Sequence, residues 1–358
     1  MRFLFKTSYD QDIALTQHGG QRFWYGLLLV ALVAAPLWLS EYMLSQLVFV
    51  AIYGIVGLGL MLLTGYTGQV SLGHAAFMAV GAYTHTLLVA AGSPFLLALA
   101  LAATLAAAVG VIVGLPALRV RGIYLAIATM AFGFIVEEVA ARWESVTGGN
   151  SGLQVPTPAI AGFKFDTTAA LYYLCLTFTV LATLAVLNLL RSPTGRAFVA
   201  IRDSEISAQS MGISAARYKT VAFAISAFLT GVAGALYAHQ IRFITPEQFT
   251  ILQSIELLLM IVIGGLGSIH GAFFGAAFII VLPQFVSWIK DFLPEALANA
   301  TGLKPVIFGA VMILVVLLEP YGMYGRWLKI RTYFQLFPLY RRGMFKRQKS
   351  FQKTERLK

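Results

Sequence analysis

Charged residues are scarce in this sequence. Only 11% of its 358 residues are Asp, Glu, Lys or Arg, and 59% are hydrophobic, whereas soluble domains carry roughly 25% charged residues. This composition excludes a water-soluble fold. The apolar residues are gathered in blocks of about twenty, which is the length that a helix needs to cross about 30 Å of hydrocarbon. The blocks are continuous and do not alternate in polarity, which excludes a membrane β-barrel.

Cysteine is nearly absent, and recognised cofactor motifs are missing. The single cysteine, Cys175, lies within an apolar block, so the sequence predicts a small packing residue and no disulfide framework. Histidine and acidic residues show no metal-type spacing such as H-E-x-x-H, and we expect no metal site. No Gly-Lys pair occurs, which excludes a G-x-x-x-x-G-K-[ST] phosphate loop. If ATP drives this protein, another chain must bind it.

The apolar blocks predict an all-α integral membrane protein, a polytopic bundle of about ten transmembrane helices. No small-residue cleavage site follows the first block, so we expect a retained span and no signal peptide. The expected spans are 23–39, 43–63, 71–91, 95–115, 123–141, 169–190, 218–240, 251–267, 272–289 and 305–319.

Lysine and arginine predict the orientation of these spans. With the N-terminus in the cytoplasm, 21 of the 26 basic residues fall on the cytoplasmic side, as basic loops do in membrane proteins. This predicts a cytoplasmic segment at 1–22, a transmembrane domain at 23–320 with a cytoplasmic loop at 191–217, and a basic cytoplasmic tail at 321–358. The net charge of +11 comes largely from that tail, which indicates contact with anionic lipids and not with nucleic acid.

A polar, glycine-rich stretch interrupts the bundle before the third span. Residues 64–74 read Thr-Gly-Tyr-Thr-Gly-Gln-Val-Ser-Leu-Gly-His, and we expect a broken or re-entrant helix there. In one interpretation Gln69, Ser71 and His74 line a translocation pathway, because polar groups at membrane depth usually mark function. In the other, the stretch is a tight interhelical loop with capping residues.

The eighth span contains an isolated acid, Glu256. A carboxylate there needs a partner, water or a proton, so we expect it in the pathway, unless it lies shallow in the interface. Two glycine pairs have the spacing that brings helix backbones together. These pairs are Gly110 with Gly114 and Gly271 with Gly275.

The predicted cytoplasmic loop mixes charges with an apolar stripe. The stripe consists of Phe198, Ile201, Ile206 and Met211, which predicts short amphipathic helices. They either lie on lipid or form a docking surface for a protein, since exposed apolar residues rimmed by charges suit a partner.

Four stretches together resemble the LivM-type permeases of branched-chain amino acid ABC importers. They are Gly65-Tyr-Thr-Gly-Gln-Val-Ser-Leu-Gly-His-Ala-Ala-Phe77, Thr147-Gly-Gly-Asn-Ser-Gly-Leu153, Arg202-Asp203 through Gly212-Ile213, and Glu256 through Gly267. The resemblance covers most of residues 40–320.

The resemblance implies a permease subunit of the bacterial inner membrane that is not itself an enzyme. Its expected partners are a related second permease (LivH-like), a periplasmic solute-binding protein and two cytoplasmic ATPase subunits, which bind ATP and Mg. No cofactor is expected on this chain. The ATPase-coupling loop is then carried by Arg202, Asp203, Glu205, Ala208 and Gly212, with Glu205 one residue displaced from the acid of the wider importer motif.

Two other functions fit the composition. An ion-coupled secondary transporter or channel also has many spans and isolated ionisable residues, although such proteins usually lack an amphipathic docking loop. A membrane-embedded enzyme fits less well, because the candidate acids and bases are scattered over separate helices. The transported solute stays open among branched-chain amino acids, urea-like solutes and aromatic acids.

Overall fold

The computed structural model describes residues 19–117, 122–160, 162–290, 303–318 and 322–336. Most of the predicted N-terminal segment and of the basic tail therefore lies outside the described residues. The α-helices are α2 (Gly19–Trp38), α3 (Glu41–Leu60), α4 (His74–Ala90), α5 (Phe95–Ala117), α6 (Ile123–Arg142), α7 (Glu144–Thr147), α8 (Thr168–Arg191), α9 (Pro193–Asp203), α10 (Glu205–Ser210), α11 (Ala215–Ile241), α12 (Ile251–Gly264), α13 (Ile269–Lys290), α15 (Leu303–Leu318) and α16 (Gly322–Leu336). The shorter elements are the π-helix η1 (Met61–Tyr66), the 3-10 helices η2 (Gly149–Ser151) and η3 (Pro246–Phe249), and the strands β1 (Leu153–Gln154), β2 (Ala159–Ile160), β3 (Phe163–Lys164) and β4 (Phe243–Ile244).

Each of the ten expected spans corresponds to a helix, and the all-α polytopic fold is confirmed. Within the described ranges eight helices are long and apolar enough to cross a membrane. The two that fall short are α4, with 17 residues, and α15, with 16. A helix of 17 residues is only about 25 Å long, and the missing turns of α4 are replaced by the non-helical residues before His74.

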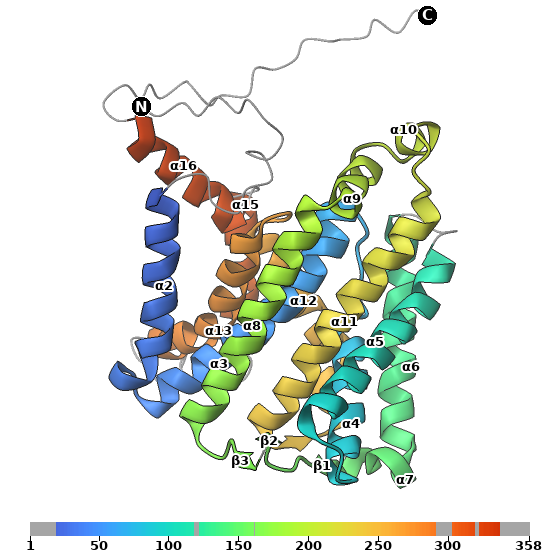
Figure 1. Cartoon of the computed structure of the whole chain (residues 1–358), viewed down its shortest axis with the longest axis vertical. Coiled ribbons are helices and arrows are strands. Elements are labelled where there is room, and N and C mark those ends of the chain that lie inside the picture. Colours follow the sequence, from blue (N-terminus) through green and yellow to red (C-terminus); the bar gives the residue numbers. More distant parts are fainter. Residues whose placement is uncertain (1–18, 118–121, 161, 291–302, 319–321, 337–358) are drawn as a thin grey trace, which may run out of the picture.

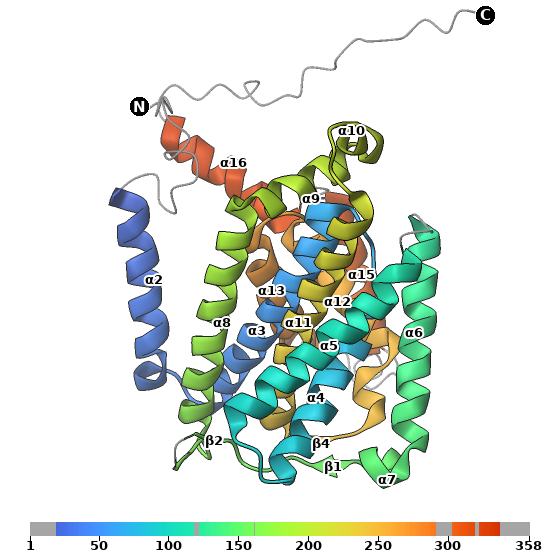
Figure 2. The same cartoon turned by 45° about the vertical axis from the view of Figure 1, so that its right-hand side comes forward.

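The long helices run antiparallel to their sequence neighbours, and the short elements gather at two opposite ends (Figures 1 and 2). One end carries the start of α2 together with α9, α10 and α16. The other end carries α7 and two small antiparallel sheets, in which β1 pairs with β4 and β2 pairs with β3. The basic residues predicted to share one side, as far as they are described, lie near this first end, in the start of α2, at the end of α8, in α9, in the start of α11 and in α16.

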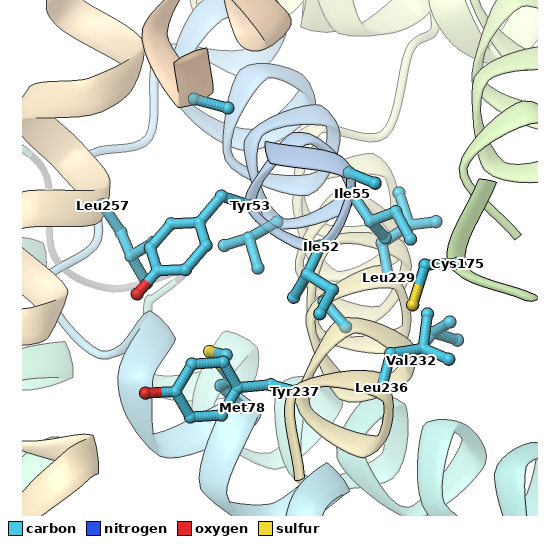
Figure 3. Close-up of a cluster of buried hydrophobic side chains, with 14 of the residues drawn as sticks. Ile52, Tyr53, Ile55, Met78, Cys175, Leu229, Val232, Leu236, Tyr237 and Leu257 are labelled. Carbon is cyan, nitrogen blue, oxygen red and sulfur yellow. The ribbon is translucent and has the colours of Figure 1, made fainter. Parts of the chain in front are cut away.

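Helix α11 is the centre of the bundle and packs against α3, α4 and α5. A Cβ atom on Gly81 of α4 would lie 2.2 Å from the Gly231 carbonyl oxygen, and one on Gly234 would lie 2.0 Å from that of Met78. Such contacts let two backbones approach closely, which is a main source of helix association in lipid. Figure 3 shows the aliphatic part of this core, with the buried thiol of Cys175 beside Leu229 and Val232.

Both predicted glycine pairs lie at close helix contacts. Gly110 and Gly114 of α5 face Ala227 and Phe223 of α11, and Gly271 and Gly275 of α13 face backbone oxygens of α12.

Helix α2 is attached through two tyrosines of α8. Pro36 lies inside α2 and has no N–H, so the carbonyl of Leu32 loses its helical donor. Tyr172 donates to that oxygen at 2.7 Å, and Tyr173 donates to the neighbouring carbonyl of Val33 at 2.9 Å. Backbone acceptors in lipid must be satisfied internally, and here the side chains of a second helix satisfy them.

Candidate functional site

The predicted interruption lies between α3 and α4. Helix α3 passes into the π-helix η1, the chain is non-helical from residue 68 to residue 73, and α4 begins at His74. We call residues 61–73 the helix break. π-Turns inside helices are frequent at functional sites, and non-helical backbone at this depth is tolerated only where protein covers it.

Polar side chains of the break bond to its own backbone. Thr67 donates to the Leu63 carbonyl at 2.6 Å, and the Gln69 amide nitrogen Nε2 donates to Thr67 Oγ1 at 3.0 Å. The backbone N–H of Gln69 also reaches the Leu63 oxygen, at 3.0 Å. These bonds replace the helical ladder where it ends.

His74 joins the break to the central helix. Its Nδ1 lies 3.1 Å from Ser71 Oγ and its Nε2 lies 2.8 Å from Ser226 Oγ of α11, so both ring nitrogens have hydroxyl partners. The first turn of α4 is capped from a third helix, because the Ala75 N–H donates to Ser254 Oγ of α12 at 3.0 Å. His74 and Ser71 are fully buried.

The structure thus places Gln69, Ser71 and His74 inside protein. Ser71, His74 and the Gln69 amide nitrogen are bonded to neighbouring groups, whereas the buried Gln69 Oε1 has no hydrogen-bond partner among the described residues. A pathway-lining role for these three residues stays a prediction. Their contacts agree with the other interpretation, a tight interhelical connection, because they join α3, α4, α11 and α12.

At the end of η1 the two glycine-rich stretches of the sequence meet. A Cβ atom on Gly65 would lie 2.4 Å from the backbone nitrogen of Gly267, which belongs to the turn between α12 and α13. Arg202 of α9 donates from Nη1 to the Gly65 carbonyl at 3.0 Å. We call this three-residue arrangement the glycine contact. It connects the surface helices directly to the helix break.

The apolar stripe of the surface helices is divided between two directions. Phe198 and Ile201 of α9 are buried against the bundle. In contrast, Ile206 of α10 is 76% exposed and Met211, which follows α10, is 83% exposed. The prediction of an exposed stripe is therefore wrong for Phe198 and Ile201, and its exposed members are Ile206 and Met211, which we call the α10 tip. Helix α10 lies at the outer end of the surface helices (Figure 2).

The residues predicted for ATPase coupling make contacts within the chain. Arg202 pairs with Asp203 at 3.0 Å, and Glu205 forms an ion pair with the buried Lys219 of α11 at 2.8 Å. Ala208 is buried against Ile201.

Gly212 ends helix α10. Its φ of +83° and the bonds Gly212 N–H to Gln209 O and Ile213 N–H to Ala208 O, both 3.0 Å, form a Schellman cap. The loop motif thus holds α10 in place, and contact of its members with an ATPase stays a prediction.

Glu256 is half-buried on α12. Gln253, three residues earlier on the same side of α12, donates to the hydroxyl of Tyr53 of α3 at 2.8 Å. The Tyr53 ring lies 6.4 Å from that of Tyr237 of α11. We call these four residues the Glu256 site. Sequence reasoning identified the acid but missed both tyrosines, because a tyrosine in an apolar span carries no mark of what it faces.

Two of the scattered histidines also meet. His85 of α4 and His239 of α11 lie with their Nε2 atoms 2.8 Å apart, and both pack on Phe95. No group of three or more His, Cys, Asp or Glu that could hold a metal ion occurs among the described residues.

Comparison with known proteins gives a consistent picture. Residues 42–316 match the family model of the branched-chain amino acid transport system permease component. The chain is 34% identical over 328 residues to the high-affinity branched-chain amino acid transport system permease protein LivM of Escherichia coli K12, covering 85% of this chain and 75% of that protein. It is 25% identical over 313 residues to the permease LivH of the same organism, covering 81% and 96% respectively.

A further relative is the probable branched-chain amino acid transport permease protein LivM of Methanocaldococcus jannaschii, at 26% identity over 234 residues, 64% of this chain and 67% of that protein. No solved structure matches. This chain, a multi-pass membrane protein, belongs to the branched-chain amino acid transport system permease family.

Proposed function

We propose that this chain forms half of the pore of an ATP-driven importer for branched-chain amino acids or related small organic solutes. The other half is a second, LivH-like permease. A periplasmic binding protein delivers the solute, and two ATPase subunits bind ATP and Mg on the cytoplasmic side of the inner membrane. The similarity of this one sequence to both LivM and LivH supports a pore of two related halves, since each half then presents an equivalent surface to its partner.

The observation that carries the proposal is the position of the α10 tip. Two large apolar side chains project from one end of a membrane protein, where exposed hydrophobic residues indicate a protein partner. Arg202, in the last turn of the adjoining α9, donates to the Gly65 carbonyl. Movement imposed on α9 and α10 by an ATPase would therefore reach the helix break through a hydrogen bond, without passing through a flexible loop.

The basic residues of the described chain favour the same orientation. They concentrate at the end that carries α9, α10 and α16, and basic segments stay on the cytoplasmic side during insertion. Docking of the ATPases at this end also requires both chain termini to be cytoplasmic, which the arrangement of α2 and α16 supports.

The test is co-purification of the ATPase subunits with the permease pair. Ile206→Asp combined with Met211→Asp removes the apolar tip without touching the buried face of α9, and we expect at least a ten-fold loss of bound ATPase. Phe163→Asp changes an exposed aromatic residue at the opposite end and should leave binding unchanged. Full ATPase binding by the tip variant would contradict the docking surface, and solute uptake without any ATPase would indicate an ion-coupled carrier instead.

A further inference from the structure

The Glu256 carboxylate has no hydrogen-bond or ion-pair partner among the described residues of the chain. Glu256 lies in a membrane-spanning helix, and no described residue hydrogen-bonds to it or forms an ion pair with it. Insertion of an isolated carboxylate at the centre of a membrane helix costs about 2.5 to 3.5 kcal/mol. A carboxylate at this depth is satisfied by water, by a proton or by a cationic partner from outside, and the groups around it decide which of these the site suits.

The groups around the carboxylate suit a cation. Tyr53 and Tyr237 lie with ring centroids 6.4 Å apart, and Phe249 lies 5.9 Å from Tyr237. Both tyrosine hydroxyls point away from Cys175 and Val232, and Leu257 lies beside the hydroxyl of Tyr53 (Figure 3). Aromatic rings attract ammonium groups through their negative faces, and hydroxyl oxygens accept N–H hydrogen bonds.

No described cationic side chain forms an ion pair with Glu256. The buried cation Lys219 is paired with Glu205 at the end that carries α10. Arg142, Lys164 and Arg242 lie in or beside the short elements of the opposite end. A positive charge that complements Glu256 would therefore come from outside the described residues, and a cationic solute is one such source.

An apolar strip adjoins the site. Leu252 is 68% exposed and Ile255 is 38% exposed on the same helix, so the described part of the chain leaves that side of α12 open. An aliphatic group held next to Glu256 would contact these two side chains. The site therefore suits a solute that has a charged end and a branched apolar end.

We infer that Glu256, with Tyr53 and Tyr237, binds the ammonium group of a zwitterionic aliphatic amino acid as it passes the pore. The assignment rests on the proposed import function and narrows it, because urea-like solutes and aromatic acids have no ammonium group. Gln253 is a positioning residue that holds the Tyr53 ring through its 2.8 Å hydrogen bond.

The experiment measures binding of radiolabelled L-leucine to the complete complex of two permeases and two ATPases in nanodiscs. Two competitors test the two charged groups of leucine one at a time. Isopentylamine has the ammonium group but no carboxylate, and 2-hydroxy-4-methylpentanoate has the carboxylate but no ammonium group. In the wild type, the amine should displace leucine at least ten-fold more effectively than the hydroxy acid. Glu256→Gln should weaken leucine binding about ten-fold or more, because charge-assisted hydrogen bonds are the strong ones.

Matched variants exclude a general defect. Glu247→Gln makes the same change at an exposed acid of η3 and should leave binding at the wild-type level, while Tyr237→Phe should cost about three-fold by losing one hydroxyl. Glu256→Asp keeps the charge and should restore preference for the amine over the hydroxy acid, even if leucine binds more weakly.

The outcomes separate this assignment from the import function. If the wild-type complex imports leucine and Glu256→Gln binds leucine and isopentylamine as the wild type does, the ammonium assignment alone is overturned. Displacement of leucine by Na⁺ as effectively as by isopentylamine also overturns it, in favour of an inorganic-ion site. A wild-type complex that imports no leucine with ATP overturns both.

Discussion

The His74 network of the helix break and the Glu256 site both bring polar residues into an apolar bundle, but they differ in whether those residues have partners within the chain. At the break, both ring nitrogens of His74 have partners within the chain, and the first turn of α4 is capped by Ser254. At the Glu256 site the carboxylate has no partner among the described residues. Satisfied buried networks fix one conformation, whereas an unpaired group is available to a ligand.

The difference separates two kinds of function that are hard to distinguish by sequence. Both regions have polar residues at membrane depth, and that property alone marks each as functional. The hydrogen-bond partners decide between them. We interpret the break and its glycine contact as the part that transmits movement, and the Glu256 site as the part that meets the solute.

The largest expected effect lies at the glycine contact. In Gly65→Val the new side chain meets the Gly267 backbone, whose nitrogen lies only 2.4 Å from the position of the added Cβ and cannot rotate away as a side chain would. Overpacking against backbone displaces whole helices, so we expect the folding stability to fall by about 3 kcal/mol or more. Size-exclusion chromatography should then show little assembled complex. Gly309→Val, on a glycine with open space around it, is the control and should assemble normally.

Loss of the histidine should be nearly as severe. His74→Ala leaves the Ser71 and Ser226 hydroxyls without their ring partner and opens a cavity, so we expect destabilisation of about 2 to 4 kcal/mol. Thermal unfolding of the complex in detergent measures it. A change in Tm no larger than that of Thr104→Ala, at an exposed threonine on α5, would contradict a structural role for the network.

Removal of the arginine link should act on coupling and not on folding. Arg202→Gln loses the charged donor to the Gly65 carbonyl, and we expect ATP-driven uptake to fall about ten-fold, equivalent to about 1.4 kcal/mol, while the ATPases remain bound. Arg217→Gln, an exposed arginine on α11, controls for lost charge. If Arg202→Gln instead releases the ATPases, Arg202 belongs to the docking surface, as the sequence analysis predicts.

The smallest effect is expected at the cap of α10. Gly212 has a left-handed backbone but open space around its Cβ position, so Gly212→Ala strains the backbone without a clash and should cost about 1 kcal/mol. Uptake should change by less than about two-fold. A loss as large as that of Arg202→Gln would show that this glycine contacts the ATPase directly.

Sequence was sufficient for the scaffold and for the location of both regions. Hydropathy located the helices because lipid imposes the length of each apolar block, and the glycines around residue 65 located the break because helical hydrogen bonding fails there. Glu256 was evident because it is an acidic residue within an apolar span.

Pairing across the bundle could not be predicted. Ser226 and Ser254 are ordinary small residues in their own helices, and only the fold shows that they meet His74 and Ala75. The burial of Ala208 and the cap at Gly212 could not be predicted either, since both depend on how α10 folds back toward α11. Contact of these two residues with a partner stays a prediction. The sequence predicts how deep a residue lies in the membrane, but which helix its side chain faces depends on tertiary packing.

One measurement tests the distinction between the two regions most directly: Tm and ATP-driven leucine uptake recorded side by side for Glu256→Gln and His74→Ala in the same reconstituted complex. We predict that Glu256→Gln keeps or raises Tm, because it removes an unpaired charge, while uptake falls about ten-fold or more. His74→Ala should lower Tm. If Glu256→Gln lowers Tm as much as His74→Ala does and uptake follows the amount of folded protein, then Glu256 is a structural residue and the account is contradicted.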